Sequence, residues 1–172
     1  MTDFVILDRD GVINVDLMTY VTRPEDFEPI EGSLEAIAQL NKNGFKVAIA
    51  TNQACIEKEI ITDIELSNIH NHMIELLGQV GGEIEYIAYC PHAPETLCEC
   101  RKPKPGMIFQ AAYEFKIDLK QSYLIGDRWK DIEAGNSLVD KIKADVGATQ
   151  GPNVLGNIGG FAGLFKLDGS IK

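Results

Sequence analysis

Two carboxylates stand one residue apart in the sequence, at Asp8 and Asp10, directly after an apolar run. A third, Asp127, follows a later apolar run, and carboxylates that converge on one point repel one another unless a cation lies between them. Oxygen ligands in a partly open shell suit Mg²⁺. Beside such an ion, the hydroxyl of Thr51 and the ammonium of Lys102 would form a cradle for a phosphoryl group. Any one of these aspartates alone could be a turn or helix-cap residue, so the prediction depends on the whole set.

The segment of residues 90–106 has a metal-binding pattern of another kind. Its three thiols and one imidazole are Cys90, His92, Cys98 and Cys100. Three thiolates and an imidazole suit a tetrahedral Zn²⁺ site, and four protein ligands leave no open position for water. The spacing therefore predicts a structural zinc that folds a loop without an apolar core of its own. Such a loop would fix Arg101 and Lys102 at the rim of the Mg²⁺ site, whereas the alternative is a set of reduced surface thiols.

The remaining cysteine and the other two histidines lack metal-binding spacing. Cys55 stands apart from the other thiols, and we interpret it as a buried or half-buried thiol. His70 and His72 lie two residues apart on a predicted helix, so their side chains point to different sides. We interpret both histidines as surface or boundary residues and not as ligands.

Length and composition indicate one globular domain. The chain has 172 residues, of which 45% are hydrophobic and 24% are charged. Its formal net charge is −10, which argues against nucleic acid as a partner because phosphate backbones require a basic face. A small phosphorylated substrate responds to local charge. The candidates for a local basic patch are Arg101, Lys102, Lys104, Arg128 and Lys130. Solvated surface cations are the alternative interpretation of these residues.

The beginning of the chain, MTDFVILDRDG, has no basic region followed by a long apolar run, so we expect no signal peptide. No stretch approaches the length of a membrane span, and we expect no membrane partner. With reduced cysteines, these features predict a cytoplasmic protein.

Apolar runs and helical stripes alternate along the chain. Strands are predicted at residues 4–7, 45–50, 84–89 and 122–125, and helices at residues 33–42 and 62–77, from 105 and from 130. This alternation favours an α/β, Rossmann-like fold, in which helices cover both faces of a mainly parallel sheet. The candidate polar residues follow strand ends, and the carboxyl edge of such a sheet is where ligands bind.

Four segments together resemble the motifs of the haloacid dehalogenase superfamily of phosphatases. They are FVILDRDGVIN, AIATNQ, CRKPKPGM and YLIGDRWKDIEAG. With its Cys/His loop, the chain resembles the branch that contains heptose 1,7-bisphosphate 7-phosphatases and histidinol-phosphate phosphatases. The segments DGVIN and IHNHM look more like the heptose enzymes, and the resemblance spans roughly residues 3–135.

The resemblance implies a role for each candidate residue. Asp8 would be the nucleophile that forms an aspartyl phosphate, and Asp10 would be the general acid and then the general base. Mg²⁺ would be held by Asp8, the backbone carbonyl of Asp10 and Asp127. Asp131 would support these ligands. The residues implied to stabilise the phosphoryl group are Thr51 and Lys102, and those implied to bind the substrate are Asp16, Tyr20, Asn52, Arg101 and Arg128.

The activity implied by the resemblance is Mg²⁺-dependent hydrolysis of a small sugar phosphate, namely the 7-phosphate of D-glycero-D-manno-heptose 1,7-bisphosphate. The alternatives are a histidinol-phosphate phosphatase and a weakly active, zinc-stabilised phosphosugar-binding protein. The insertions after the first and second motifs are short, so we expect an open site and no large cap domain. We also expect a monomer.

Two regions depart from the family pattern. The second motif usually continues as TNQSGIxRG, whereas residues 51–59 are TNQACIEKE, with Ala54, Cys55, Lys58 and Glu59 at the changed positions. Lysine does not reproduce the bidentate grip of arginine on phosphate, so altered affinity or specificity is expected. The tail resembles the amino-terminal region of phosphoribosylformylglycinamidine cyclo-ligase. We therefore divide the chain into a phosphatase domain, residues 1–135, and an atypical segment, residues 136–172, which either completes the same domain or packs loosely.

Overall fold

A six-stranded sheet, in the order β3-β2-β1-β4-β5-β6, forms the centre of the molecule. The structure is a computed structural model that describes residues 3–119, 122–146, 153–158 and 161–163. The strands are β1 (Phe4–Leu7), β2 (Lys46–Asn52), β3 (Tyr86–Cys90), β4 (Tyr123–Gly126), β5 (Asn153–Ile158) and β6 (Phe161–Gly163). The helices are α1 (Ser33–Lys42), α2 (Asp63–Gln79), α3 (Gly106–Phe115) and α4 (Trp129–Val146), with short 3₁₀ helices at Pro24–Asp26 and Pro94–Thr96.

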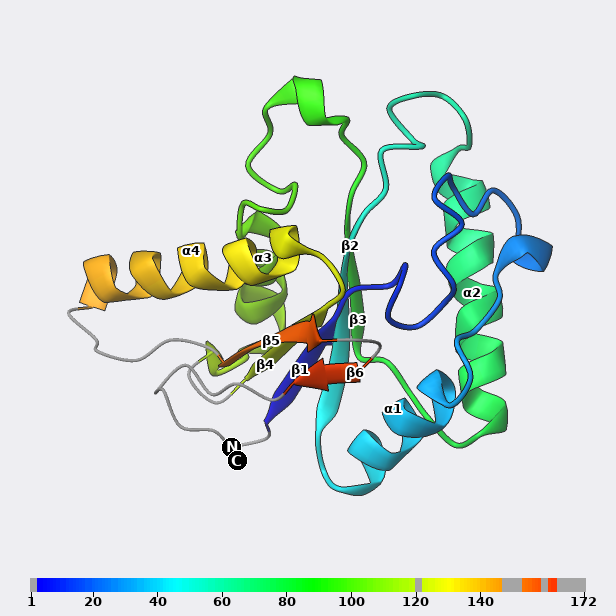
Figure 1. Cartoon of the computed structure of the whole chain (residues 1–172), viewed down its shortest axis with the longest axis horizontal. Helices are drawn as coiled ribbons and strands as arrows, with labels where there is room; N and C mark the ends of the chain where they lie inside the picture. The colour runs from blue at the N-terminus through cyan, green and yellow to red at the C-terminus, as the bar shows by residue number, and fades with distance from the viewer. Residues whose placement is uncertain (1–2, 120–121, 147–152, 159–160, 164–172) are drawn as a thin grey trace.

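Among the described strands, neighbours from β3 to β5 run parallel, and only the pair β5–β6 is antiparallel. Helices α1 and α2 lie on one side of the sheet and α3 and α4 on the other, as Figure 1 shows. Along β1, Val5 and Leu7 belong to the core under α1 and α2, whereas Phe4 and Ile6 belong to the opposite core. Successive strand residues face opposite ways, so a continuous apolar run marks a strand covered on both faces. The predicted α/β fold with a mainly parallel sheet is confirmed.

Helix α2 begins at the capping box that its sequence predicts. The hydroxyl of Thr62 accepts a hydrogen bond from the backbone N–H of Glu65 at 3.2 Å, and the Glu65 carboxylate accepts one from the Thr62 N–H at 2.8 Å. These bonds satisfy donors that a helix start leaves unpaired. Leu66, Ile69 and Met73 then form a buried stripe toward the sheet.

The C-terminal part of the chain extends the same sheet. Helix α4 runs across the boundary predicted at residue 135, and β5 pairs in parallel with β4, with Leu155 opposite Ile125. The division into two segments itself stays a prediction. Among the described residues no separate cap domain is inserted, and none of their helices is long and apolar enough to cross a bilayer.

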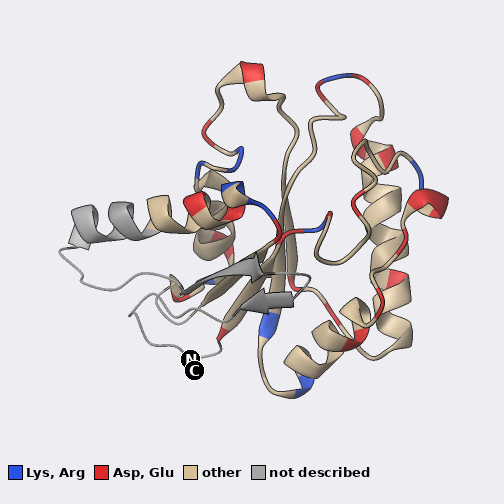
Figure 2. Cartoon of the chain, viewed as in Figure 1, with Lys and Arg blue, Asp and Glu red and all other residues tan. Residues whose placement is uncertain are grey.

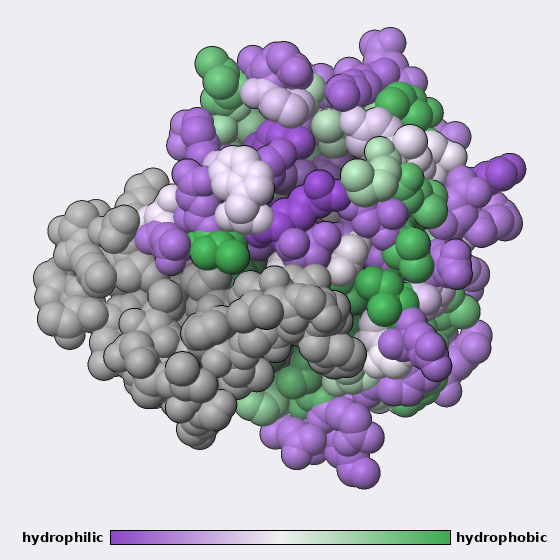
Figure 3. Space-filling view, in the orientation of Figure 1, coloured by the Kyte–Doolittle hydropathy of each residue, from purple (hydrophilic) through white to green (hydrophobic). Residues whose placement is uncertain are grey.

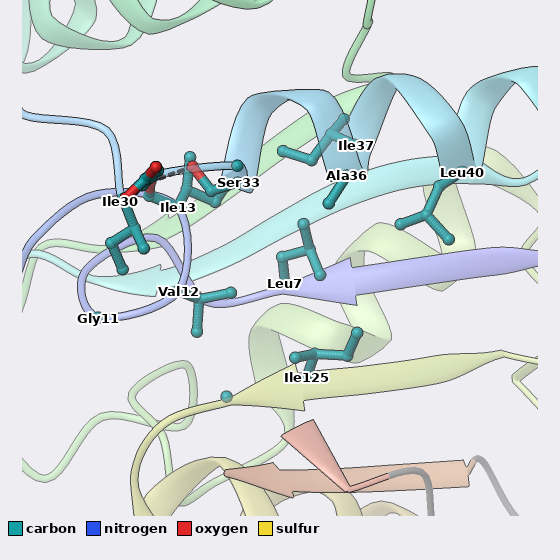
Figure 4. A pocket seen from close by; sticks show the side chains of 13 residues that line it. Leu7, Gly11, Val12, Ile13, Ile30, Ser33, Ala36, Ile37, Leu40 and Ile125 are labelled. Carbon is teal, nitrogen blue, oxygen red and sulfur yellow. Dashed lines mark hydrogen bonds between the residues drawn. The ribbon is translucent and has the colours of Figure 1, made fainter. Parts of the chain in front are cut away.

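An apolar pocket of about 220 Å³ opens between α1 and the strands β1 and β4. Figure 4 shows side chains of Ile37 and Leu40 from α1 across from Leu7 and Ile125 of the strands. The lining is mostly aliphatic, so this pocket differs in chemistry from the charged strand ends beside it.

Candidate active site

The carboxyl ends of neighbouring strands bring the expected site residues together. Asp8 follows β1, Asp127 follows β4, and Thr51 lies at the end of β2. Lys102 reaches Asp8 from the loop between β3 and α3. Acidic and basic residues meet at this edge in Figure 2, and the space-filling view shows hydrophilic side chains around a hollow in the centre of the same face (Figure 3). The structure therefore gathers these residues at one edge, as the strand pattern predicts.

Lys102 is a buried cation between two carboxylates. Its Nζ lies 2.8 Å from Asp8 Oδ2 and 2.6 Å from Asp131 Oδ1. Burial lowers the pKa of Lys102, but the charges of Asp8 and Asp131 outweigh it, so the pKa is raised and the ammonium is kept. Asn52 fixes the backbone at this point, because its amide donates to the Lys102 carbonyl at 3.1 Å and accepts from the Lys102 N–H at 3.0 Å. Both ends of the Asn52 amide are thus occupied by the backbone of Lys102.

The acidic cluster has the donor set of a magnesium site. One ligand atom each from Asp8, Asp127 and Asp131 lies within 4.8 Å of the others. Asp131 is already engaged by Lys102 and by the backbone N–H of Arg128. Oδ1 of Asp127 is buried without a hydrogen-bond partner, and burial raises the pKa of this carboxyl. A hard divalent cation would satisfy that oxygen, so the residues fit Mg²⁺.

Burial likewise raises the pKa of Asp8 to about 6, against the opposing charge of Lys102. The N–H of Arg9 donates to Asp8 Oδ1 at 2.8 Å, which fixes the orientation of the carboxylate. Two glycines leave room for the cluster: a Cβ on Gly11 would lie 2.2 Å from Asp127 Oδ2, and one on Gly126 would lie 2.1 Å from the Asp131 carboxyl carbon. The close approach of the carboxyl groups therefore depends on glycine at these two positions as well as on the ion pairs.

The carboxylate of Asp10 is held by donors that the sequence analysis missed. Arg9 Nη2 donates to both oxygens at 2.9 and 3.1 Å, and the amides of Asn14 and Gln53 each donate at 3.0 Å. Burial raises the pKa of Asp10, but the Arg9 charge and these hydrogen bonds outweigh it, and the pKa is lowered. Gln53 also donates to Thr51 Oγ1 at 2.9 Å, so the hydroxyl proton of Thr51 is free to be donated elsewhere.

Arg9 is almost completely buried, at 1% exposure, and reaches helix α2. Its Nη1 lies 3.2 Å from Nε2 of His70, which is itself only 6% exposed and lies edge-on to Tyr89. The interpretation of His70 as a surface or boundary residue is therefore wrong, because its face of α2 packs against the loop after β1. His72 faces another side and lies edge-on to Phe27. The one feature of the sequence that could have indicated a buried role for Arg9 is its position between the two motif aspartates, Asp8 and Asp10.

The rim of the site carries the residues expected to bind substrate. Arg128 forms an ion pair with Asp16, which ties the start of α4 to the loop after β1. Tyr20 lies under the ammonium of Lys58, 5.7 Å from Nζ to the ring centroid. Lys58, one of the changed positions of the second motif, therefore lies beside a residue expected to contact the sugar.

The Cys/His loop brings its four predicted ligands together. Sγ of Cys100 lies 2.9 Å from Sγ of Cys90, 3.4 Å from Sγ of Cys98 and 3.2 Å from Nδ1 of His92. A tetrahedron with Zn–S bonds of about 2.3 Å has edges of roughly 3.8 Å, so small outward shifts admit the ion. All four cysteines of the chain are free, and Arg101 donates to the His92 carbonyl at 2.9 Å. The cluster fits Zn²⁺ and ties Arg101 to the metal-binding loop.

The changed second motif is docked on this loop. Glu57 accepts hydrogen bonds from the Ala93 N–H and, at 2.6 Å, from the Thr96 hydroxyl. Its own N–H donates to the Pro91 carbonyl at 3.2 Å. Cys55 is fully buried, as predicted. Glu57 thus joins the zinc loop to the segment that follows Thr51, a connection that no sequence pattern indicated.

Comparisons with known proteins agree with this geometry. Residues 5–150 match the family model described as polynucleotide kinase 3 phosphatase. The D-glycero-β-D-manno-heptose-1,7-bisphosphate 7-phosphatase of Pseudomonas putida is 45% identical over 130 residues, which are 76% of this chain and 74% of that protein. The enzyme of the same name from Helicobacter pylori strain J99 is 40% identical over 149 residues, which are 86% of this chain and 84% of that protein.

Among solved structures, the D,D-heptose 1,7-bisphosphate phosphatase of B. bronchiseptica, complexed with magnesium and phosphate, superposes with a TM-score of 0.75 at 34% identity. The match covers 88% of this chain and 91% of that chain. The chain therefore belongs to the haloacid dehalogenase phosphatases, in the family of the D-glycero-β-D-manno-heptose-1,7-bisphosphate 7-phosphatases.

Proposed function

We propose that this chain is a Mg²⁺-dependent phosphatase that removes the 7-phosphate of D-glycero-β-D-manno-heptose 1,7-bisphosphate. The observation that carries the reaction type is the buried pair of Asp8 and Lys102, 2.8 Å apart, beside the unpartnered Oδ1 of Asp127. A nucleophilic carboxylate flanked by a cation and a metal site suits phosphoryl transfer. The substrate is supported by the relatives, whose names state this activity.

The reaction proceeds in two displacements at phosphorus. A carboxylate oxygen of Asp8 attacks and the bond from phosphorus to the sugar oxygen breaks. Asp10, which has to carry a proton when substrate is bound although its pKa is lowered in the free protein, gives that oxygen the proton. Water then attacks the phosphorus of the aspartyl phosphate, Asp10 takes up the proton of the water, and phosphate leaves as the Asp8 carboxylate re-forms. Thr51 and Lys102 hold the phosphoryl oxygens in both steps. Asp8, the Asp10 carbonyl and Asp127 would hold Mg²⁺, which would neutralise charge on those oxygens when bound.

We propose that some residues around this centre contact the substrate, whereas Asn52 acts indirectly. Arg101 and Arg128 bind the second phosphate of the substrate, and Asp16 and Tyr20 contact the sugar. Asn52, which the resemblance implied to bind the substrate, instead acts through the backbone of Lys102 in our proposal, because both ends of its amide are engaged there. The zinc site is structural, and we propose that the protein acts as a monomer in the cytoplasm, where thiols stay reduced.

A polynucleotide substrate, which the description of the family model names, is disfavoured by the net charge of −10. Histidinol phosphate remains the competing small substrate, because its phosphatases share the branch that the motifs resemble. A bisphosphate gives the rim arginines a second anionic group to bind, which favours the heptose substrate.

The test is phosphate release from heptose 1,7-bisphosphate and from histidinol phosphate, side by side at equal concentration with Mg²⁺. We expect strong preference for the bisphosphate, and a loss of about 10⁴-fold or more in the Asp8→Asn variant. Preference for histidinol phosphate would transfer the assignment to the competing substrate. Inactivity on both would favour a binding protein, and undiminished release by Asp8→Asn would show that the nucleophile is another group.

A further inference from the structure

A buried series of polar contacts connects helix α2 to the carboxylate of Asp10. Nε2 of His70 lies 3.2 Å from Nη1 of Arg9, and Nε and Nη2 of Arg9 donate to Asp10 at 2.9 to 3.2 Å. His70 and Arg9 are 6% and 1% exposed, so water does not compete for these contacts. The mechanism proposed above uses Asp10 and leaves both other residues without a task.

The direction of the first contact follows from the chemistry of its partners. A guanidinium has five N–H donors and no acceptor, so Nε2 of His70 must accept and its ring must be neutral. Burial and the neighbouring charge of Arg9 lower the pKa of His70 to about 4, which agrees with a neutral ring. The donors of Arg9 lie in one rigid plane. The contact of Nη1 with His70 therefore also fixes the direction of Nε and Nη2, which donate to Asp10.

We propose that His70 is a positioning residue for the proton transfers of Asp10, and that it acts through Arg9. The inference rests on the proposed function, in which Asp10 protonates the leaving oxygen. Without an acceptor at residue 70, Nη1 becomes an unpaired buried donor, and Arg9 must shift to recover a partner. Asn14 and Gln53 still hold the Asp10 carboxylate, so its alignment is degraded and not abolished.

The experiment compares three variants. His70→Leu keeps the bulk and removes the acceptor, His70→Gln keeps an acceptor oxygen, and His72→Leu changes the other histidine of α2. For heptose 1,7-bisphosphate we expect His70→Leu to lower kcat about 10- to 100-fold with KM within about twofold. His70→Gln should recover most of the loss, and His72→Leu should match the unchanged protein.

A second substrate separates positioning from general damage. The leaving group of p-nitrophenyl phosphate needs no proton, so its release in the first turnover should be affected far less by His70→Leu than release of the sugar. Equal losses on both substrates, or no loss in a folded His70→Leu variant, overturn the proposal. If the aryl phosphate is not turned over, the test uses the bisphosphate alone. A loss in kcat with KM unchanged and recovery by His70→Gln then supports the proposal, and the absence of either overturns it. Inactivity of the unchanged protein on the bisphosphate would instead overturn the proposed function, and with it this inference.

Discussion

The acidic strand edge and the Cys/His loop hold cations by opposite means. At the edge, the protein supplies its own counterion, because Lys102 lies between Asp8 and Asp131 within 2.8 Å of each. In the loop, four ligand atoms converge, while residues 91–105 bury only Ala93 and Lys102. The sheet and its ion pairs thus place the edge without a metal, whereas we propose that zinc holds the loop in place. In our proposal, one metal therefore serves the chemistry and the other serves the folding of the loop.

The largest expected effect comes from removing the internal counterion of the edge. Lys102→Met leaves two buried carboxylates without their cation, so the free energy of unfolding should fall by about 3–5 kcal/mol at pH 7. Phosphate release should be lost as well. Urea unfolding of the Mg²⁺-free protein measures the first effect. Lys104→Met is the matched control, because the Lys104 side chain is 41% exposed and its ion pair with Glu99 contributes less than about 1 kcal/mol. Similar costs for both variants would show that the edge does not depend on its internal ion pairs.

Removal of zinc should act on the loop and on the thermal stability. We expect Cys98→Ser, or a zinc-selective chelator, to remove about 2 kcal/mol of stability and so to lower the Tm by roughly 4–8 °C. Omitting Mg²⁺ should abolish phosphate release while shifting the Tm less. Calorimetry and zinc analysis on the same samples measure both effects. A larger fall in Tm without Mg²⁺ than without zinc would reverse the comparison.

Acid should lower the free energy of unfolding through protonation of His70, independently of either metal. Burial first, and then Arg9, lower the pKa of this histidine to about 4 in the folded protein. Between about pH 6.5 and 4 the unfolded chain binds a proton that the folded protein does not, so stability falls as the pH falls, by about 2–3 kcal/mol. Urea unfolding at pH 7 and 4.5 should show a reduced pH dependence in His70→Gln and an unchanged one in His72→Gln. The same dependence in both variants would assign the acid sensitivity to other groups.

The smallest expected effect concerns the connection between the two regions. Glu57→Gln weakens the acceptors for the Ala93 N–H and the Thr96 hydroxyl, so zinc should leave the loop about threefold faster. The rate is measured by transfer of zinc to a chromogenic chelator. Glu59→Gln, an exposed change in the same segment, should leave the rate unaltered. Faster release from both variants would point to a general loss of charge and not to the Glu57 contacts.

The sequence predicted the strand ends better than the contacts between them. Apolar runs placed Asp8 and Asp127 at one edge, because parallel strands end together. Spacing alone predicted the zinc ligands, since metal ligands must be close in space. The burial of Arg9 and its contact with His70 could not be predicted, because charged side chains are usually exposed and the partner lies 61 residues away. The docking of Glu57 on the zinc loop depends likewise on tertiary packing.

The strand order determines when each edge of the central strand β1 can pair during synthesis of the chain. Leu7 of β1 pairs with Ile49 on one side and with Ile125 on the other, so the partners of one strand are made far apart in time. At about 5–20 residues per second, the second edge of β1 waits roughly 6–24 seconds for β4 to be translated. Four apolar residues with an open edge are a template for aggregation. The nascent chain therefore exposes an unpaired edge of its central strand for several seconds, until β4 is synthesised.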